Sequence, residues 1–147
     1  MRARASNIAA SILLLIVGGV IYALWRSRSL LMFQWFDAGG IGPLIDRSRG
    51  YVHFIHVAAW LRYSLPDALW ACSGVFLFSA IWTGSRSPVR HLWICIAPLL
   101  AIGGELAQAM HLIPGTFDLV DLLTCVLLAA GTSLAVTRRL RHHVRPC

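Results

Sequence analysis

Charged residues are scarce in this sequence. They make up 13% of the 147 residues, compared with about 25% in soluble domains, while hydrophobic residues make up 58%. Too few charges remain to cover a water-exposed surface, so the composition excludes an ordinary soluble domain and indicates that lipid solvates much of the chain. The length fits a single domain.

Lysine is absent, and arginine supplies all thirteen basic residues of a chain with a formal charge of +7. A positive charge of this size could serve nucleic-acid binding, but that function needs basic residues clustered on a soluble face. Here the arginines stand between apolar runs, which favours a membrane protein and argues against nucleic acid as a partner.

The four cysteines form no CxxC pair. Cys72, Cys95 and Cys125 lie inside apolar runs and Cys147 is the last residue, so buried thiols are a better interpretation than two disulfides.

Four apolar runs have the length that a bilayer crossing requires. The first has eighteen residues without a charge, which span about 27 Å as a helix. A cleaved signal peptide is the alternative for this run, but its apolar stretch is long and its end is a poor cleavage site. The sequence therefore predicts an all-α integral membrane bundle of four transmembrane helices. Trp25, Trp82 and Trp93 lie at the ends of the apolar runs, and Trp60 and Trp70 lie near the start of the second, as expected for an aromatic belt. The expected helices cover residues 8–25, 66–83, 92–112 and 119–136.

Residues 26–65 connect the first two helices and do not form a crossing of their own. Their first half is apolar but contains Asp37 and several helix breakers, namely Gly39, Gly40, Gly42 and Pro43. We therefore expect an irregular, re-entrant or interfacial segment here.

The arginines indicate the orientation. With four crossings, both termini share a side that carries eight of them: Arg2, Arg4, Arg86, Arg90, Arg138, Arg139, Arg141 and Arg145. The other side carries five arginines and every acidic residue: Arg26, Arg28, Arg47, Arg49, Arg62, Asp37, Asp46, Asp67, Glu105, Asp118 and Asp121. The positive-inside rule places both termini in the cytoplasm, and acidic partners can neutralise the outer arginines.

Carboxylates gather at the outer end of three expected helices. Glu105 and Gln108 share a helix face, Asp118 and Asp121 repeat the same spacing, and Asp67 opens the second helix. The three aspartates could be simple helix caps, with Ser64 capping the helix that Asp67 begins.

Glu105 is too deep to be a cap, since it lies about 10 Å below the surface at the helical rise. Lipid does not solvate a carboxylate, so we expect Glu105 to face the bundle interior, where it would be protonated, hydrogen-bonded or paired with an arginine. Such a group is a candidate functional residue, although a structural clamp to an arginine or to a glutamine remains an alternative.

Three histidines allow a further interpretation. His53 and His56 have the spacing of metal ligands on a helix, and His111 lies on the same outer side, so a metal or haem site is conceivable. Interfacial histidines without a ligand are the commoner case, and we predict no metal and no cofactor.

The acidic motifs resemble the signature of the VanZ-like membrane proteins. That family has a Glu-x-x-Gln on one helix and a Phe-Asp-x-x-Asp opening the next, which are similar to residues 104–108 (GELAQ) and 115–121 (GTFDLVD). Residues 65–70 (LPDALW) resemble an element of a subgroup of small VanZ-like proteins. The chain lacks the family's arginine before Phe-Asp and its Asn-x-x-Gly in the last helix. The resemblance implies a bacterial inner-membrane protein, in a family associated with resistance to glycopeptide antibiotics.

Three function classes follow from these observations. The leading hypothesis is a cell-envelope protein whose outward-facing pocket binds a polar headgroup or a lipid-linked cell-wall precursor. Its binding residues would be Asp67, Gln108, Arg26 and Arg62, with the arginines contacting phosphate, and its candidate acid and base groups would be Glu105, Asp118 and Asp121. No nucleophile is evident, so whether the protein is an enzyme stays open.

The second hypothesis is a non-enzymatic membrane subunit that docks on a larger complex through small-residue helix faces. Those faces would contain Gly18, Gly19, Gly103, Gly104, Ala129, Ala130 and Gly131. The third is a haem or quinone electron carrier that uses His53, His56 or His111.

Overall fold

The computed structural model describes residues 2–85, 87–113 and 116–142. Within these ranges every regular element is a helix, which confirms the all-α prediction. A helix corresponds to each of the four expected apolar runs: α1 (Arg2–Trp25), α5 (Leu65–Ile81), α6 (Val89–Ala109) and α7 (Leu119–His142). Helices α5 and α6 end before residues 83 and 112, where the sequence analysis placed their ends. Parts of two sequence predictions, Gly115 of the acidic motif and Arg86 and Arg145 of the basic side, lie outside the described residues.

Three of the long helices in the described ranges are long and apolar enough to cross a membrane, namely α1, α6 and α7. The fourth, α5, has 17 residues and is shorter. At about 1.5 Å per residue it is roughly 26 Å long, slightly below the thickness of a hydrocarbon core. The structure thus supports a membrane protein with three candidate spans.

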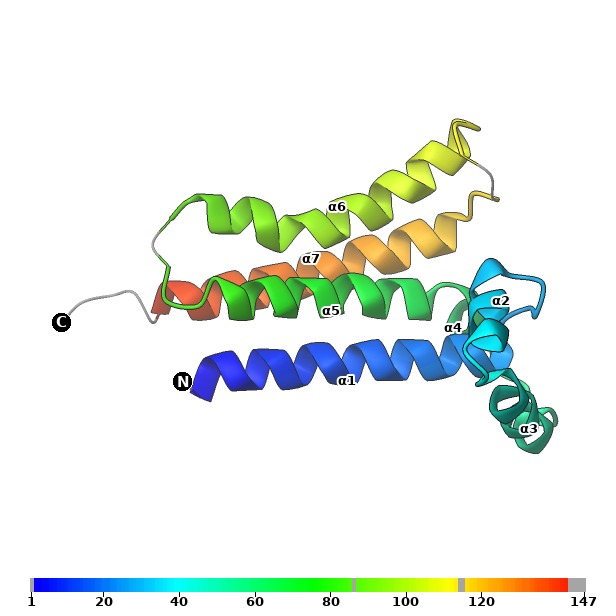
Figure 1. The fold of residues 1–147 in the computed structure, drawn as a ribbon. Coiled ribbons are helices and arrows are strands. Elements are labelled where there is room, and N and C mark those ends of the chain that lie inside the picture. The colour runs from blue at the N-terminus through cyan, green and yellow to red at the C-terminus, as the bar shows by residue number, and fades with distance from the viewer. Residues whose placement is uncertain (1, 86, 114–115, 143–147) are drawn as a thin grey trace.

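Helix α5 lies at the centre of the fold. It packs against α1 on one side and against α6 and α7 on the other, whereas α1 makes no extensive contact with α6 or α7 in the described part of the chain (Figure 1). Small residues make this central position possible, since the buried positions of α5 include Ala68, Ala71, Ser73 and Ala80. The arrangement is therefore not a closed ring of four helices.

Polar side chains hold α1 against α5 along its length. Asn7 donates to the Ser79 hydroxyl at 2.9 Å, and the Ser11 and Ser73 hydroxyls lie 3.0 Å apart in a buried pair. Hydrogen bonds of this kind between membrane helices contribute about 0.6–2 kcal/mol each.

Helix α6 approaches α5 closely at one point. A Cβ atom on Gly74 would lie 2.4 Å from the Cβ of Ala97, so only glycine permits this contact. Pro98 follows immediately inside α6, where it removes one backbone hydrogen bond and favours a bend. Towards its C-terminal end α6 diverges from α5 (Figure 1). As its short connector to α7 predicts, α6 runs antiparallel to α7 and packs on it.

The segment between α1 and α5 contains three short helices: α2 (Leu31–Ala38), α3 (Gly42–Val52) and α4 (Ala59–Tyr63). The prediction of an irregular segment was therefore incomplete, because the expected helix breakers act at helix boundaries. Gly39 ends α2, Gly40 adopts a φ of 75°, and Pro43 stands in the first turn of α3, where its missing N–H has no cost.

The start of α1, the turn between α5 and α6, and the far end of α7 lie at one end of the bundle, and α2, α3 and α4 lie at the other (Figure 1). We call this second end the acidic end, since the six acidic residues belong to α2, α3, the beginnings of α5 and α7, and the last part of α6.

Candidate functional site

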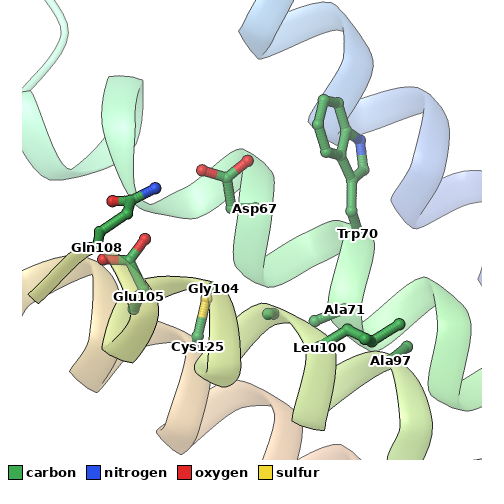
Figure 2. Close-up of a pocket in the computed structure, with 10 residues that line it drawn as sticks. Asp67, Trp70, Ala71, Ala97, Leu100, Gly104, Glu105, Gln108 and Cys125 are labelled. Carbon is green, nitrogen blue, oxygen red and sulfur yellow. The ribbon is translucent and has the colours of Figure 1, made fainter. Parts of the chain in front are cut away.

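An open pocket of about 430 Å³ lies between α5 and α6 near the acidic end (Figure 2). Its lining combines three polar side chains with mostly apolar ones: Asp67, Glu105, Gln108, Trp70, Ala71, Ala97, Leu100, Ala101, Gly104 and Cys125. Its position follows from the packing, because α6 touches α5 at Gly74 and Ala97 and diverges from α5 towards the acidic end (Figure 1). Ala101 and Gly104 keep the resulting space free of large side chains.

Glu105 and Gln108 line the pocket from the last turns of α6. Figure 2 shows their polar ends at the same end of the pocket as the carboxylate of Asp67. The Oε2 atom of Glu105 is buried and has no hydrogen-bond partner in the described part of the chain. Glu105 thus faces a pocket between helices, and an unpartnered buried oxygen of this kind is costly unless a proton, water or ligand satisfies it.

Asp67 pairs with Arg26, whose Nη2 lies 3.3 Å from Oδ2 of the carboxylate. The Arg26 guanidinium also lies over the rings of Tyr22 and Tyr63, with its central carbon 5.4 and 5.3 Å from their centroids. Cation–π contacts of this geometry fix the arginine in place. The structure therefore places Arg26 against a protein carboxylate.

The expected cap at the start of α5 is wrong. Ser64 makes no side-chain cap, and its hydroxyl instead donates to Oδ1 of Asp121. A tertiary contact explains why Ser64 does not cap α5: the first turn of α7 lies beside the start of α5, and Asp121 offers a charged acceptor to the Ser64 hydroxyl. Asp121 therefore joins two helices next to the pocket, without lining it.

Asp118 is exposed and accepts a hydrogen bond from the backbone N–H of Val120 at 2.8 Å. This is the geometry of a helix cap, so the simpler interpretation of Asp118 is confirmed. Arg62 lies on α4, over the ring of Tyr63 at 4.9 Å, and outside the pocket lining. Of the seven predicted site residues, the structure brings Asp67, Glu105 and Gln108 together.

No family model, curated protein or solved structure matches this chain. The resemblance to VanZ-like proteins therefore rests on residues 65–70 and on the two acidic motifs. Their residues divide by position: Glu105 and Gln108 line the pocket, while Asp118 and Asp121 serve α7 and its contact with Ser64.

Sequence reasoning missed Trp70 and Cys125 as pocket residues, because it treated them as part of an aromatic belt and as an inert buried thiol. A signal for the pocket was present in α6. Ala97, Ala101, Gly104 and Gln108 recur at intervals of four, three and four residues, which places small residues and one amide on a single helix face.

The histidines do not converge. His53 and His56 are exposed, and Nδ1 of His53 lies 2.7 Å from the carbonyl oxygen of Gly50. His111 follows the end of α6 with a φ of 57°. Among the described residues, no three His, Cys, Asp or Glu side chains are grouped so that they could hold a metal ion.

Proposed function

We propose that this chain is a membrane protein of four crossings whose pocket binds the polar headgroup of an amphiphile. The contacts between α1 and α5 support a fourth crossing by α5. Asn7 near the start of α1 meets Ser79 near the end of α5, and Arg26 just after α1 meets Asp67 at the start of α5. The shorter helix therefore occupies the same depth as a helix that is long enough to span a bilayer.

The packing gives an amphiphile a route from the membrane. Because α1 and α6 lie on opposite sides of α5 without extensive contact, the pocket is open and not sealed by a fourth wall. Leu99 and Leu100 of α6 are exposed, as lipid-facing residues are. An apolar chain can lie along this surface while its headgroup reaches the polar end of the pocket.

The charges favour a cationic headgroup. Asp67 already pairs with Arg26, and Glu105 pairs with no cation among the described residues. A phosphate would meet two carboxylates, whereas an ammonium group would supply both a compensating charge and a hydrogen-bond donor for Oε2 of Glu105. The single observation that carries this proposal is the buried, unpartnered Oε2 atom of Glu105 in an open pocket.

The arginine distribution supports an outward-facing pocket, because eight arginines fall on the side of the termini and five on the side of the pocket. The resemblance to VanZ-like proteins then favours the bacterial inner membrane, with an aminated lipid or a lipid-linked cell-wall precursor as the ligand and a link to glycopeptide resistance. Catalysis by Glu105 finds little support, since Asp118 caps its own helix and Asp121 is held by Ser64.

A second candidate function is that of a docking subunit. Gly103 and Gly131 are exposed, and a Cβ atom on either would meet nothing within 4 Å, so another helix could approach these positions closely. Gly18 and Gly104 do not belong to such a surface, because Gly18 is buried against Trp70 and Gly104 lines the pocket.

The test compares headgroups on one apolar chain. Protein purified in a neutral detergent is mixed with dodecylammonium, dodecyl phosphate or dodecanol at equal concentrations, and bound molecules are counted by native mass spectrometry. We expect binding of dodecylammonium in preference to the other two. A preference for dodecyl phosphate would contradict the charge argument, and absence of binding by all three would contradict the pocket as an amphiphile site and favour the docking subunit.

A further inference from the structure

Helix α3 has its apolar face turned away from the protein. At 100° per residue, Leu44 and Tyr51 lie on one face of this helix, and their side chains are 66% and 65% exposed. Phe54 and Ile55 follow the helix directly and are exposed as well. In a water-soluble domain such a face would be packed against the core.

The opposite face of α3 is polar and holds the helix to the bundle. Arg49 donates from Nη1 to the carbonyl oxygens of Ala23 and Arg26, at 2.9 and 2.8 Å, and so satisfies acceptors at the end of α1. Asp46 accepts a hydrogen bond from Arg28 at 2.8 Å. Arg49 and Asp46 of α3 therefore bind other parts of the protein, whereas Leu44 and Tyr51 are left exposed.

The position of α3 explains where this apolar face can be solvated. Figure 1 shows α3 beside the end of α1, projecting from the bundle on the side away from α6. The flank of α1 carries exposed apolar residues such as Ile12, Ile16 and Val20. A helix that projects beside the end of a membrane-spanning helix lies at the level of the lipid headgroups.

Arg47 adds a charge to the same surface. It is exposed, one turn from both Leu44 and Tyr51, and it forms no ion pair within the described residues, whereas Arg26 and Arg28 at the same end each do. A helix that combines aromatic and aliphatic residues with an unpaired arginine is typical of a membrane interface.

We infer that α3 is an interfacial anchor that lies in the plane of the membrane at the acidic end. Leu44, Tyr51 and Phe54 enter the boundary between headgroups and acyl chains, and Arg47 binds the phosphate of an anionic phospholipid. The anchor depends on the membrane crossings and is independent of what the pocket binds.

Photo-crosslinking tests the anchor. The photoreactive amino acid benzoylphenylalanine is placed at position 44 or at position 51 of the full chain, in vesicles of equal parts phosphatidylglycerol and phosphatidylcholine. Position 50 is the matched control, because Gly50 is exposed, lies on the polar face, and has no atom within 4 Å of an added Cβ. We expect lipid adducts from positions 44 and 51 and few from position 50.

Other outcomes would overturn the inference. Cross-linked dimers at positions 44 and 51 would assign the surface to a second copy of the chain, and equal lipid adducts at all three positions would show no interfacial face.

The phosphate contact of Arg47 has its own test. In the chain with Arg47, adducts should be enriched about fivefold in phosphatidylglycerol, as expected for one basic residue near an anionic surface, and Arg47→Gln should abolish this enrichment. Equal enrichment in both chains would show that Arg47 does not bind the lipid phosphate.

Discussion

Ser64 and Asp121 are hydrogen-bonded across 57 residues of sequence, and this contact fixes the start of α5 against the first turn of α7. Ser64 is 1% exposed, so its hydroxyl is shielded from water, whereas Asp121 is partly exposed. The contact lies next to the pocket that contains Asp67, Glu105 and Gln108. It positions the helix from which Asp67 reaches that pocket.

Ser64→Ala should lower the free energy of unfolding by about 1–3 kcal/mol, because it removes a buried donor to a carboxylate. Thermal unfolding in detergent measures the loss. Ser48→Ala is the control, since Ser48 bonds only to the Leu44 carbonyl of its own helix and should change stability little. Equal stability of the two variants would contradict the role of the contact.

Asp118→Ala should cost about 0.5–2 kcal/mol of stability, because Asp118 caps α7 through the Val120 N–H. Asp118→Asn keeps an oxygen acceptor and should restore most of this stability. Neither change should affect amphiphile binding by more than twofold. A loss of binding in Asp118→Asn with normal stability would show that Asp118 contributes to the binding site.

Gly18 and Gly19 form a matched pair on α1. A Cβ on Gly18 would lie 2.7 Å from the indole nitrogen of Trp70, whereas a Cβ on Gly19 meets nothing within 4 Å. Gly18→Ala should therefore destabilise the protein by about 1–3 kcal/mol through overpacking. Gly19→Ala should be neutral or stabilising by up to about 1 kcal/mol through helix propensity. Similar melting temperatures for both variants would show that α1 does not pack on Trp70 as described.

The orientation can be tested at Thr116, which is exposed between α6 and α7. Thr116→Cys should react in intact cells with a maleimide that cannot cross the membrane, because the positive-inside rule places this end outside. A cysteine at Arg4, at the opposite end of the bundle, should react only after the cells are broken. The reverse labelling pattern would invert the proposed topology.

The long helices could be predicted because their apolar runs are close to the length that a bilayer demands, which is a local property of the sequence. The short helices could not be predicted. Helix α3, for example, exposes its apolar face and is held by hydrogen bonds from Arg49 to carbonyl oxygens of Ala23 and Arg26. The contacts of Arg26 with Asp67 and of Ser64 with Asp121 could not be predicted either, because both pairs join segments that are distant in sequence.

The pocket could be predicted only in part. The shared face of Glu105 and Gln108 was predictable from helical spacing, and the structure places both residues in one pocket. The open space could not be predicted, because it depends on the contact of Gly74 with Ala97 and on the divergence of α6 from α5 (Figure 1).

The most direct test of the account is the effect of Glu105→Gln on the dissociation constant for dodecylammonium. The substitution keeps the shape of the side chain and removes its charge. A hydrogen bond between charged groups contributes about 1.5–3 kcal/mol, so binding should weaken by about tenfold or more. Asp46→Asn removes a carboxylate at the same end that pairs with Arg28 outside the pocket, and it should leave the constant within about twofold. Tenfold weaker binding in Glu105→Gln alone is the predicted result, and unchanged binding in Glu105→Gln would contradict the proposed site.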